Sequence, residues 1–484
     1  MANNATGGAL SASAFIGHRP RGAGDLSVET HGIAPIGEDE RYGRPARLFT
    51  VWFAPNITMT GVFTGTLAIA LGLGFWLGLA AMIIGTILGS VVVAYLSTWG
   101  PRTGTAQLPN ARMAFGGFVV VPALLQWLSS IAWDGLVGLF GGEALAVLAG
   151  IPFWTAVLVV LALQGAVGYF GYEVIHRVQA VLTLILFATF VVFAVKVVAG
   201  QQVITPASAH GSDLVGAFVL EVTIALSLAI SWASYAADFS RYLPAATSRL
   251  AVFAFSCAGI VLAYVFVQGI GIAAAGVLSE QTANGVRAVM GGGVLGAAAL
   301  AVIALASVGS CAMNDYSGSL ALQTIGIRVR RPLSAVVVTV IAFGLILWLH
   351  SADTAKRFQD LLLLVGYWIP AFVAVIGIDW LIRSRGRSTI NPAHESTRRV
   401  DAAAALVVFV AAYAAAVPFM NTSLIEGPVA KSWHGADVAY FVNFFVAAGL
   451  YGAYRAVRAA SSGAETSVGS ERPRSTTGPR DTQS

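Results

Sequence analysis

The sequence is poor in charged residues. Asp, Glu, Lys and Arg make up only 11% of its 484 residues, whereas 57% are hydrophobic and the mean hydropathy is +0.77. Soluble domains carry about 25% charged residues. The composition therefore excludes a water-soluble enzyme or binding domain and indicates an integral membrane protein that crosses the bilayer many times.

Cysteine is also scarce. The two cysteines, Cys257 and Cys311, lie in different apolar segments, so we expect no structural disulfide. The sequence has no Cys and His cluster with metal-ligand spacing, so we expect no bound metal and no cofactor. An HExxH motif is lacking too, as is a GxSxG motif between a strand and a helix, which disfavours a membrane enzyme.

Long hydrophobic runs are missing from both ends of the chain. Residues 1–45 are polar and Gly-rich without an apolar signal region, so we expect no cleavable signal peptide and a disordered N-terminal tail. Residues 460–484 are rich in Ser, Thr, Arg and Gly and predict a second disordered tail.

Between these tails, twelve apolar runs are long enough to cross a bilayer, which takes about 20 mostly apolar residues. The predicted fold is therefore an all-α integral membrane protein with twelve transmembrane helices. The runs lie near residues 50–74, 75–98, 118–140, 152–170, 180–199, 214–236, 250–278, 290–322, 333–350, 359–383, 402–420 and 436–457.

The basic residues are distributed unevenly over the loops between these runs. With the N-terminus inside the cell, the cytoplasmic loops hold most of the arginines, five of them between residues 383 and 399. By the positive-inside rule, this asymmetry predicts a multi-pass protein of the plasma membrane with both termini in the cytoplasm, and it makes nucleic-acid binding a poor explanation of the basic character. The opposite side holds only Lys196, Arg287, Lys356, Arg357 and Lys431.

The first apolar run is interrupted by a group of residues that do not favour a membrane helix. Pro55, Asn56, Thr58, Thr60 and Gly61 fall together near its cytoplasmic half. Proline removes a backbone donor, and neighbouring amide and hydroxyl groups can replace it. The pattern predicts that the first transmembrane helix is discontinuous.

The sixth run has an interruption of its own. It becomes small and polar at Ser231, Ala233 and Ser234, beside Trp232. The two interruptions are five spans apart, and this odd offset places the second one in the membrane upside down. Paired interruptions of this kind indicate an inverted-repeat transporter with its substrate at the midplane, which makes Ser231 a candidate contact. The alternative is that small residues only allow helices to pack closely.

The third run places Trp133 and Asp134 at a depth where such residues are unusual. A carboxylate inside the membrane is costly unless it faces a cavity or a partner, so Asp134 is a candidate functional residue. The alternative is a structural pairing of Asp134. Trp133 suits stacking on a planar ring, although simple packing would also explain it.

The eighth run carries a polar band within a helix otherwise made of Ala, Leu and Val. The band includes Ser307, Ser310, Asn314 and Asp315. An asparagine amide offers two donors and an acceptor, which suits reading the edge of a heterocyclic base. The alternative is an interhelical hydrogen bond that holds the bundle together.

Three segments resemble those of the purine-cytosine permeases of the nucleobase:cation symporter family. They are WGPRTGTAQLPNARMAFG at 99–116, SYAADFSRYLP at 234–244 and MNDYSGSLALQ at 313–323. The resemblance extends over about residues 40–460, and the combination of segments is specific for the family but less so for the substrate.

The resemblance implies uptake of a nucleobase, cytosine or a purine, with a proton or a sodium ion by alternating access. It implies two inverted five-helix repeats with discontinuous first and sixth helices, followed by two helices. We accordingly assign residues 46–400 to a ten-helix transport core and 401–459 to two peripheral helices. The implied partners are this small molecule, H⁺ or Na⁺ and the lipid bilayer.

The resemblance also assigns roles to single residues. Trp133 matches the tryptophan that stacks on the substrate ring, and Asn314 matches the asparagine that hydrogen-bonds it. Trp232 lies near the aromatic residue of the sixth span. Asn56 and Thr58 fall where family members expose polar groups to the ligand.

The chain departs from the family pattern in the third span. Family members place a Gln or Asn one turn after the tryptophan, where this chain has Val137. Asp134 lies next to the tryptophan instead, so it could read an N–H group of the substrate or accept the coupling proton.

A second departure concerns the coupling ion. Sodium-coupled relatives have a Ser-Thr pair about five residues before the asparagine, where this chain has Val308 and Gly309. Ser307 and Ser310 flank that position as candidate coupling residues without a clean match. The pattern favours protons over sodium. Alternatives are a sodium-coupled carrier of a related heterocycle, such as allantoin, hydantoin, uracil or a vitamin precursor, and a membrane sensor on the same scaffold.

Overall fold

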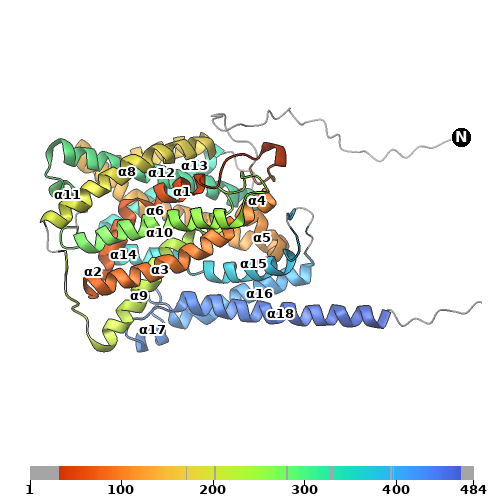
Figure 1. Ribbon diagram of the computed structural model, residues 1–484. Coiled ribbons are helices and arrows are strands. Elements are labelled where there is room, and N and C mark those ends of the chain that lie inside the picture. The colour runs from red at the N-terminus through yellow and green to blue at the C-terminus, as the bar shows by residue number, and fades with distance from the viewer. Residues whose placement is uncertain are drawn as a thin grey trace, which may run out of the picture.

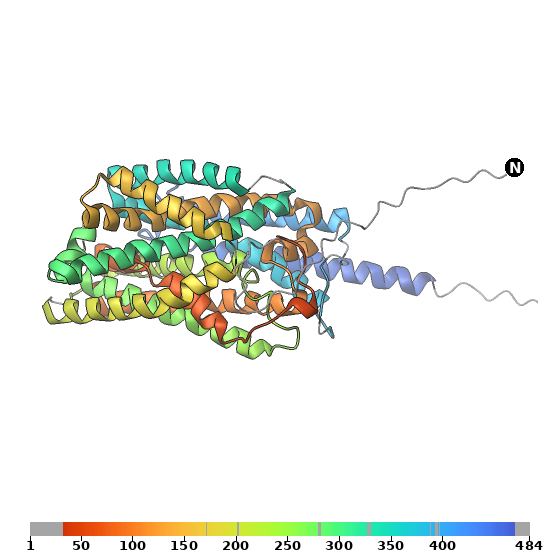
Figure 2. The same ribbon diagram turned by 90° about the horizontal axis from the view of Figure 1, so that it is seen from above.

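The computed structural model describes residues 32–170, 172–200, 203–278, 282–326, 331–387, 389–392, 395 and 397–469. These residues form a bundle in which long helices run side by side (Figures 1 and 2). Short 3₁₀ segments (η) interrupt or extend several helices. The α-helices are α1 (Arg47–Phe53), α2 (Met59–Ala70), α3 (Gly74–Ser97), α4 (Trp99–Thr103), α5 (Gln107–Phe115), α6 (Val120–Ala149), α7 (Phe153–Phe170), α8 (Tyr172–Gly200), α9 (Gly211–Ile230), α10 (Arg249–Ala274), α11 (Thr282–Val289), α12 (Gly293–Ile325), α13 (Arg331–Ser351), α14 (Thr354–Gly366), α15 (Ile369–Arg383), α16 (Arg399–Ala416), α17 (Pro428–Ser432) and α18 (Ala439–Gly469).

Seven helical segments in this part of the chain are long and apolar enough to cross a membrane. Four shorter apolar helices, including α2 and the described part of α13, accompany them. Each of the twelve predicted runs falls on one or more of the observed helices. An all-helical, multi-pass membrane architecture is therefore confirmed, whereas the count of twelve spans and the repeat symmetry stay predictions.

Close approach of helix backbones depends on glycine. A Cβ atom added to Gly85 of α3 would lie 2.2 Å from the carbonyl oxygen of Val222 in α9, and one added to Gly271 of α10 would lie 1.9 Å from that of Val62 in α2. Only a residue without a side chain fits at either contact. Small residues at helix interfaces are typical of membrane bundles, because they let backbones pack against each other.

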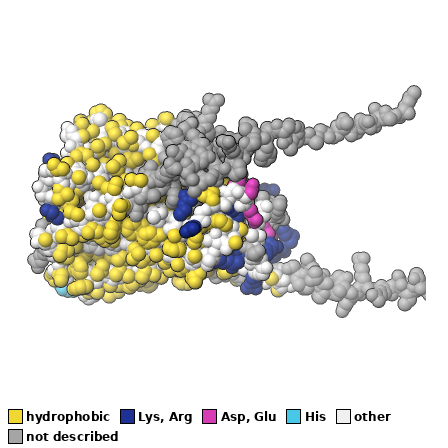
Figure 3. Space-filling model, turned by 45° about the horizontal axis from the view of Figure 1, so that its top comes forward, with side chains coloured by type: hydrophobic (Ala, Val, Ile, Leu, Met, Phe, Trp, Pro, Cys, Tyr) yellow, Lys and Arg dark blue, Asp and Glu magenta, His cyan; other side chains and the backbone are white. Residues whose placement is uncertain are grey.

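The surface of the bundle is apolar over most of the face shown in Figure 3, and Lys and Arg side chains gather towards one end. Large hydrophobic side chains point outward from several helices, with Val294 exposed by 88% and Leu184 by 74%. Such a surface is stable in contact with lipid rather than water.

The N-terminal tail is shorter than predicted. We expected disorder through residue 45, but the segment from Gly32 onward lies against the bundle. Ile36 is buried, its N–H donates to Gly104 O at 2.9 Å, and Tyr42 N–H donates to Tyr242 O at 2.7 Å. The two backbone hydrogen bonds and the buried Ile36 side chain fix this segment against the bundle, although its sequence is polar and Gly-rich. At the other end, α18 continues nine residues past the predicted boundary at 460.

The segment between the second and third runs is rich in Gly and Pro but is folded into helices. It forms α4 and α5, which are almost entirely buried. Gly104 makes the turn between them with φ 63°, and Trp99 stacks on Trp380 of α15 with ring centroids 4.2 Å apart. Packing against α15 explains why this polar segment is folded into the protein.

Candidate functional site

The first break separates α1 from α2. The α-helix ends at Phe53, a 3₁₀ turn covers Ala54–Asn56, and Thr58 has an extended backbone (φ −131°, ψ 161°) before α2 begins. The Asn56 side chain donates through Nδ2 to Trp52 O at 2.6 Å. The predicted proline-led break is therefore present, and an amide side chain satisfies a backbone carbonyl beside it.

The second break follows α9. The α-helix ends at Ile230, and the chain continues as a 3₁₀ turn, η4 (Ser231–Tyr235), and then as turns. Ser231 Oγ donates to Ser227 O at 2.6 Å, and Ser234 Oγ donates to Ser231 O at 3.4 Å. The hydroxyls thus bond to the backbone at the position where the helix loses its regular geometry.

Two of the predicted site residues join the breaks directly. Trp232 Nε1 donates to Asn56 Oδ1 and to the hydroxyl of Tyr264 in α10, each at 2.9 Å. Its ring packs edge-on against Trp52 with centroids 5.5 Å apart. In this conformation Trp232 and Asn56 bind each other and fix the two breaks side by side. Thr58, also buried, lies two residues beyond Asn56 at the start of α2.

The third and eighth runs, now α6 and α12, supply the polar centre. Asn314 Nδ2 of α12 donates to Asp134 Oδ1 of α6 at 3.2 Å. Asp134 is fully buried, and its second oxygen, Oδ2, accepts no hydrogen bond from the described residues. Trp133, beside it, is 8% exposed. The structure therefore brings together Asp134 and Asn314, which are 180 residues apart in sequence.

The candidate coupling serines lie on the same α6–α12 contact. Ser307 Oγ donates to Val137 O of α6 at 3.2 Å, and Ser310 is buried on α12 three residues further along. Val137 is the residue that replaces the polar side chain of the family pattern. The Val137 side chain cannot accept a hydrogen bond, and the Ser307 hydroxyl donates to the Val137 backbone carbonyl instead.

Sequence reasoning did not assign a role to Asp315 or Gln164. Gln164 of α7 donates through Nε2 to Asp315 Oδ2 at 3.4 Å, and the carboxyl groups of Asp315 and Asp134 lie within hydrogen-bonding reach of each other. The polar band around Asn314 contained Asp315, but nothing in the sequence showed that α7 would place a buried amide beside it.

Packed side chains lie on both sides of this region. Towards the end that carries α11 and α17, Phe63, Phe140 and Phe358 form a cluster with ring centroids 5.0 to 5.8 Å apart. Towards the other end, Asp238 accepts from Gln107 N and Ser317 Oγ, each at 2.8 Å. The Asp134–Asn314 centre therefore lies between an aromatic cluster and a buried polar cluster.

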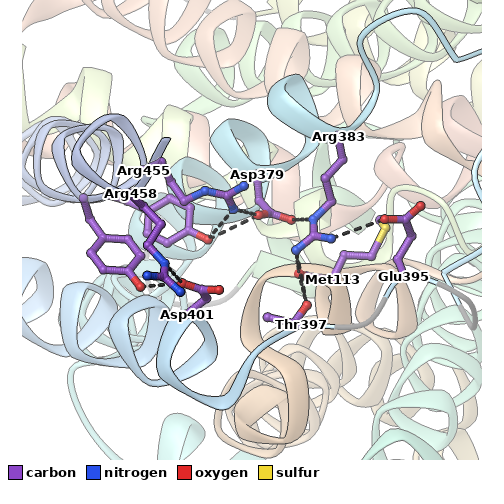
Figure 4. A network of polar contacts seen from close by, with 10 residues as sticks. Met113, Asp379, Arg383, Glu395, Thr397, Asp401, Arg455 and Arg458 are labelled. Carbon is purple, nitrogen blue, oxygen red and sulfur yellow. Dashed lines mark hydrogen bonds and ion pairs between the residues drawn. The ribbon is translucent and has the colours of Figure 1, made fainter. Parts of the chain in front are cut away.

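A network of ion pairs lies at the end of the bundle that holds α4 and α5 (Figure 4). Asp379 of α15 accepts from Arg383 Nε at 2.6 Å and pairs with Arg455 of α18. Arg383 also donates to Met113 O of α5 at 2.9 Å, and Arg458 pairs with Asp401 of α16 at 3.3 Å. The network ties the last two long helices to the core.

The sequence matches a family model over residues 35–443, described as permeases for cytosine/purines, uracil, thiamine and allantoin. This chain belongs to that family. It is therefore a permease of the nucleobase/cation symporter type and not an enzyme.

Curated relatives of this permease have related names. A putative purine-cytosine permease of Bacillus subtilis is 26% identical over 442 residues, which cover 88% of this chain and 95% of the relative. A purine-cytosine permease of Emericella nidulans is 24% identical, covering 89% and 88%. A vitamin B6 transporter of Saccharomyces cerevisiae is 23% identical, covering 74% and 66%.

Solved structures confirm the fold of the permease. Mhp1, a nucleobase-cation-symport-1 family transporter solved in a closed conformation with bromovinylhydantoin bound, superposes with a TM-score of 0.70 at 18% identity and covers 88% of this chain and 94% of its own. A sodium-coupled sialic acid symporter superposes with a TM-score of 0.55 at 12% identity. At these identities the likeness concerns the fold alone.

Proposed function

We propose that this permease imports a nucleobase, cytosine or a purine, together with protons by alternating access. The observation that carries the proposal is the Asp134–Asn314 contact, a buried pair of hydrogen-bonding groups on two helices. A neutral heterocycle with N–H and C=O groups on one edge can be read by a carboxyl and an amide.

In the proposed site, Trp133 and Trp232 stack on the two faces of the ring, and Asn314 and Asp134 read its edge. Asn56, which now accepts from Trp232, and the residues Thr58 and Ser231 at the breaks supply further polar contacts. Aromatic side chains suit this role because every base has a π-face. On binding, the substrate would replace the contacts that these side chains now make with each other.

We assign the coupling to protons, at Asp134, with Ser307 and Ser310 beside it. Ser307 donates its hydroxyl proton to Val137 O, and the neighbouring positions are Val308 and Gly309, which offer no side-chain oxygen for a sodium ion. A carboxyl group is the one side chain among these candidates that can take up and release a proton.

The proposed topology has twelve transmembrane helices in a plasma membrane, with both termini in the cytoplasm. Residues 46–400 would form the ten-helix core of two inverted repeats, and residues 401–459 the two peripheral helices. The gathering of arginines at the end with α4 and α5 supports this orientation.

A second candidate is a related heterocycle as substrate, with sodium as the coupled ion. The vitamin B6 transporter among the relatives and the hydantoin in the structural neighbour favour this breadth. In this proposal, the hydrogen-bonding groups of Asp134 and Asn314 decide between the two substrate classes.

The test is uptake of radiolabelled cytosine, adenine, hypoxanthine, uracil, allantoin and hydantoin in a transport-deficient host, with and without sodium. We expect one of the nucleobases to accumulate and the rate to follow the pH gradient rather than sodium. Background uptake of all six compounds, with the protein present in the membrane, would refute the nucleobase assignment.

A further inference from the structure

A second carboxyl group lies beside the proposed site. Asp315 follows Asn314 on α12, and its carboxyl group is within hydrogen-bonding reach of that of Asp134 on α6. Gln164 of α7 donates to Asp315 Oδ2 at 3.4 Å, while Asn314 donates to Asp134 Oδ1 at 3.2 Å. Each acid thus has one amide donor, and the two acids face each other.

No cation neutralises the two acids within the described part of the chain. The ion pairs there do not include either carboxylate, and the other titratable side chains that face Asp134 are Cys311 of α12 and Tyr235 of η4. The remaining neighbours, Asn314 and Gln164, are uncharged. Two carboxylates this close repel each other when both are ionised, so such a pair binds a shared proton more tightly than either acid would alone.

We propose that Asp134 and Asp315 form one proton-binding unit, with a single proton held between their carboxyl groups, and that this unit couples proton and substrate movement. The inference rests on the proposed function. Asp134 is sealed from solvent, whereas Asp315 keeps some exposed surface. Asp315 is therefore the member that exchanges the proton with water, and Gln164 positions it.

The geometry also explains why proton and substrate would travel together. Asn314 has to turn its amide from Asp134 towards the base, which removes the one amide donor that Asp134 has among the described residues. A buried carboxylate that loses a donor is costly, and a proton shared with Asp315 offsets that cost. Substrate binding therefore favours the protonated pair, and by linkage the proton favours substrate binding. On release, Asn314 returns to Asp134 and the proton leaves to water.

The first test uses the purified full-length permease in liposomes, with accumulation driven by a pH gradient compared with counterflow exchange at equal pH. We expect Asp315→Asn to abolish gradient-driven accumulation while counterflow continues. Asp134→Asn should also abolish gradient-driven accumulation, with slower counterflow because Asp134 contacts the substrate as well. The double variant should lose no more than either single one, because members of one unit are not additive. Gradient-driven accumulation at the wild-type level in Asp315→Asn would overturn the proposal.

Glu221→Gln is the matched control. Glu221 of α9 is also fully buried, and neither of its oxygens has a hydrogen-bond partner among the described residues. It differs from the pair in having no second carboxyl beside it. We expect this variant to keep the proton coupling of the wild type. Loss of coupling here, with coupling intact in Asp315→Asn, would place the proton at Glu221 instead.

The second test does not depend on transport. The infrared carbonyl band of protonated carboxyl groups is recorded for the purified protein, in the Glu221→Gln background to remove that acid's contribution. If the two acids share one proton, Asp134→Asn and Asp315→Asn should each remove the same part of the band. The comparison is made at a pH where the Glu221→Gln protein shows that part. Two independent parts, each lost in only one variant, would overturn the pair. Absence of any nucleobase counterflow would refute the proposed function alone, and the band would still decide the pair.

Discussion

Buried carboxylates occur in two regions of this permease, and they differ in the partners that surround them. At the end with α4 and α5, Asp379 is 1% exposed and meets two guanidinium groups (Figure 4). At the α6–α12 contact, Asp134 is equally buried and meets one amide and a second acid.

We infer from this contrast that Asp379 is a structural carboxylate and propose that Asp134 is a functional one. Burial alone does not distinguish them, because both side chains are removed from solvent. Two guanidinium groups pair with Asp379, and these contacts join α15, α18 and α5 into one unit, whereas no cation pairs with Asp134 in the part of the chain that the structure describes. A group that can change its protonation state is the kind that a proton-coupled carrier requires.

The largest expected effect lies in the ion-pair network. Asp379→Ala leaves Arg383 and Arg455 without their shared carboxylate, and breaking a buried pair in this way costs about 3 to 5 kcal/mol. We expect a large loss of folded protein and a lower unfolding temperature in detergent, measured by a fluorescence thermal-stability assay. Wild-type stability would show that the network does not hold the peripheral helices.

A smaller effect, of another kind, is expected from Trp133→Ala. Loss of base stacking weakens binding by about 1 to 3 kcal/mol, while the unfolding temperature should change far less than in Asp379→Ala. Competition by unlabelled substrate against labelled uptake measures the affinity. Trp133→Phe, which keeps an aromatic ring, is the control and should retain most of the binding.

Trp232→Phe tests the hydrogen bonds that link the two helix breaks. It removes the indole N–H that reaches Asn56 and Tyr264, at a cost of about 1 kcal/mol for a hydrogen bond of this type. We expect reduced affinity with an intact fold, read from the concentration dependence of uptake. Tyr264→Phe, which removes only one of the two acceptors, should have the milder effect; equal affinity in all three proteins would contradict the assignment.

The smallest effect is expected at the rim of the network. The Asp401 side chain is 19% exposed and that of its partner Arg458 is 36% exposed, so solvent screens this pair. Asp401→Asn should cost less than about 1 kcal/mol and leave uptake unchanged. A loss as large as that of Asp379→Ala would mean that burial does not rank the two ion pairs.

Sequence alone marked most residues of the candidate site because the signals were local. Pro55 and Asn56 marked the first break, and Ser231 and Ser234 marked the second. Polar residues at membrane depth marked Asp134 and Asn314, which the structure places in contact. In each case a polar residue or a proline stands in an otherwise apolar helical segment, and this exception is visible in the sequence without the fold.

Other features depend on contacts between distant segments and could not be read in the same way. Asp379 and Arg455 are 76 residues apart, and no local pattern pairs them. The burial of α4 and α5 depends on packing against α15, a segment distant in the sequence. In the sequence, Asp315 is one member of a polar band, and its proximity to Asp134 and Gln164 depends on the packing of α6 and α7 against α12.

The most direct test of this account is accumulation of a labelled nucleobase in liposomes that contain wild-type protein or Asp134→Asn, with and without an inward pH gradient. We predict that the wild type concentrates its substrate only with the gradient, and that Asp134→Asn exchanges substrate but concentrates none. Gradient-driven accumulation that survives in Asp134→Asn would contradict the claim that this buried carboxyl couples transport to protons.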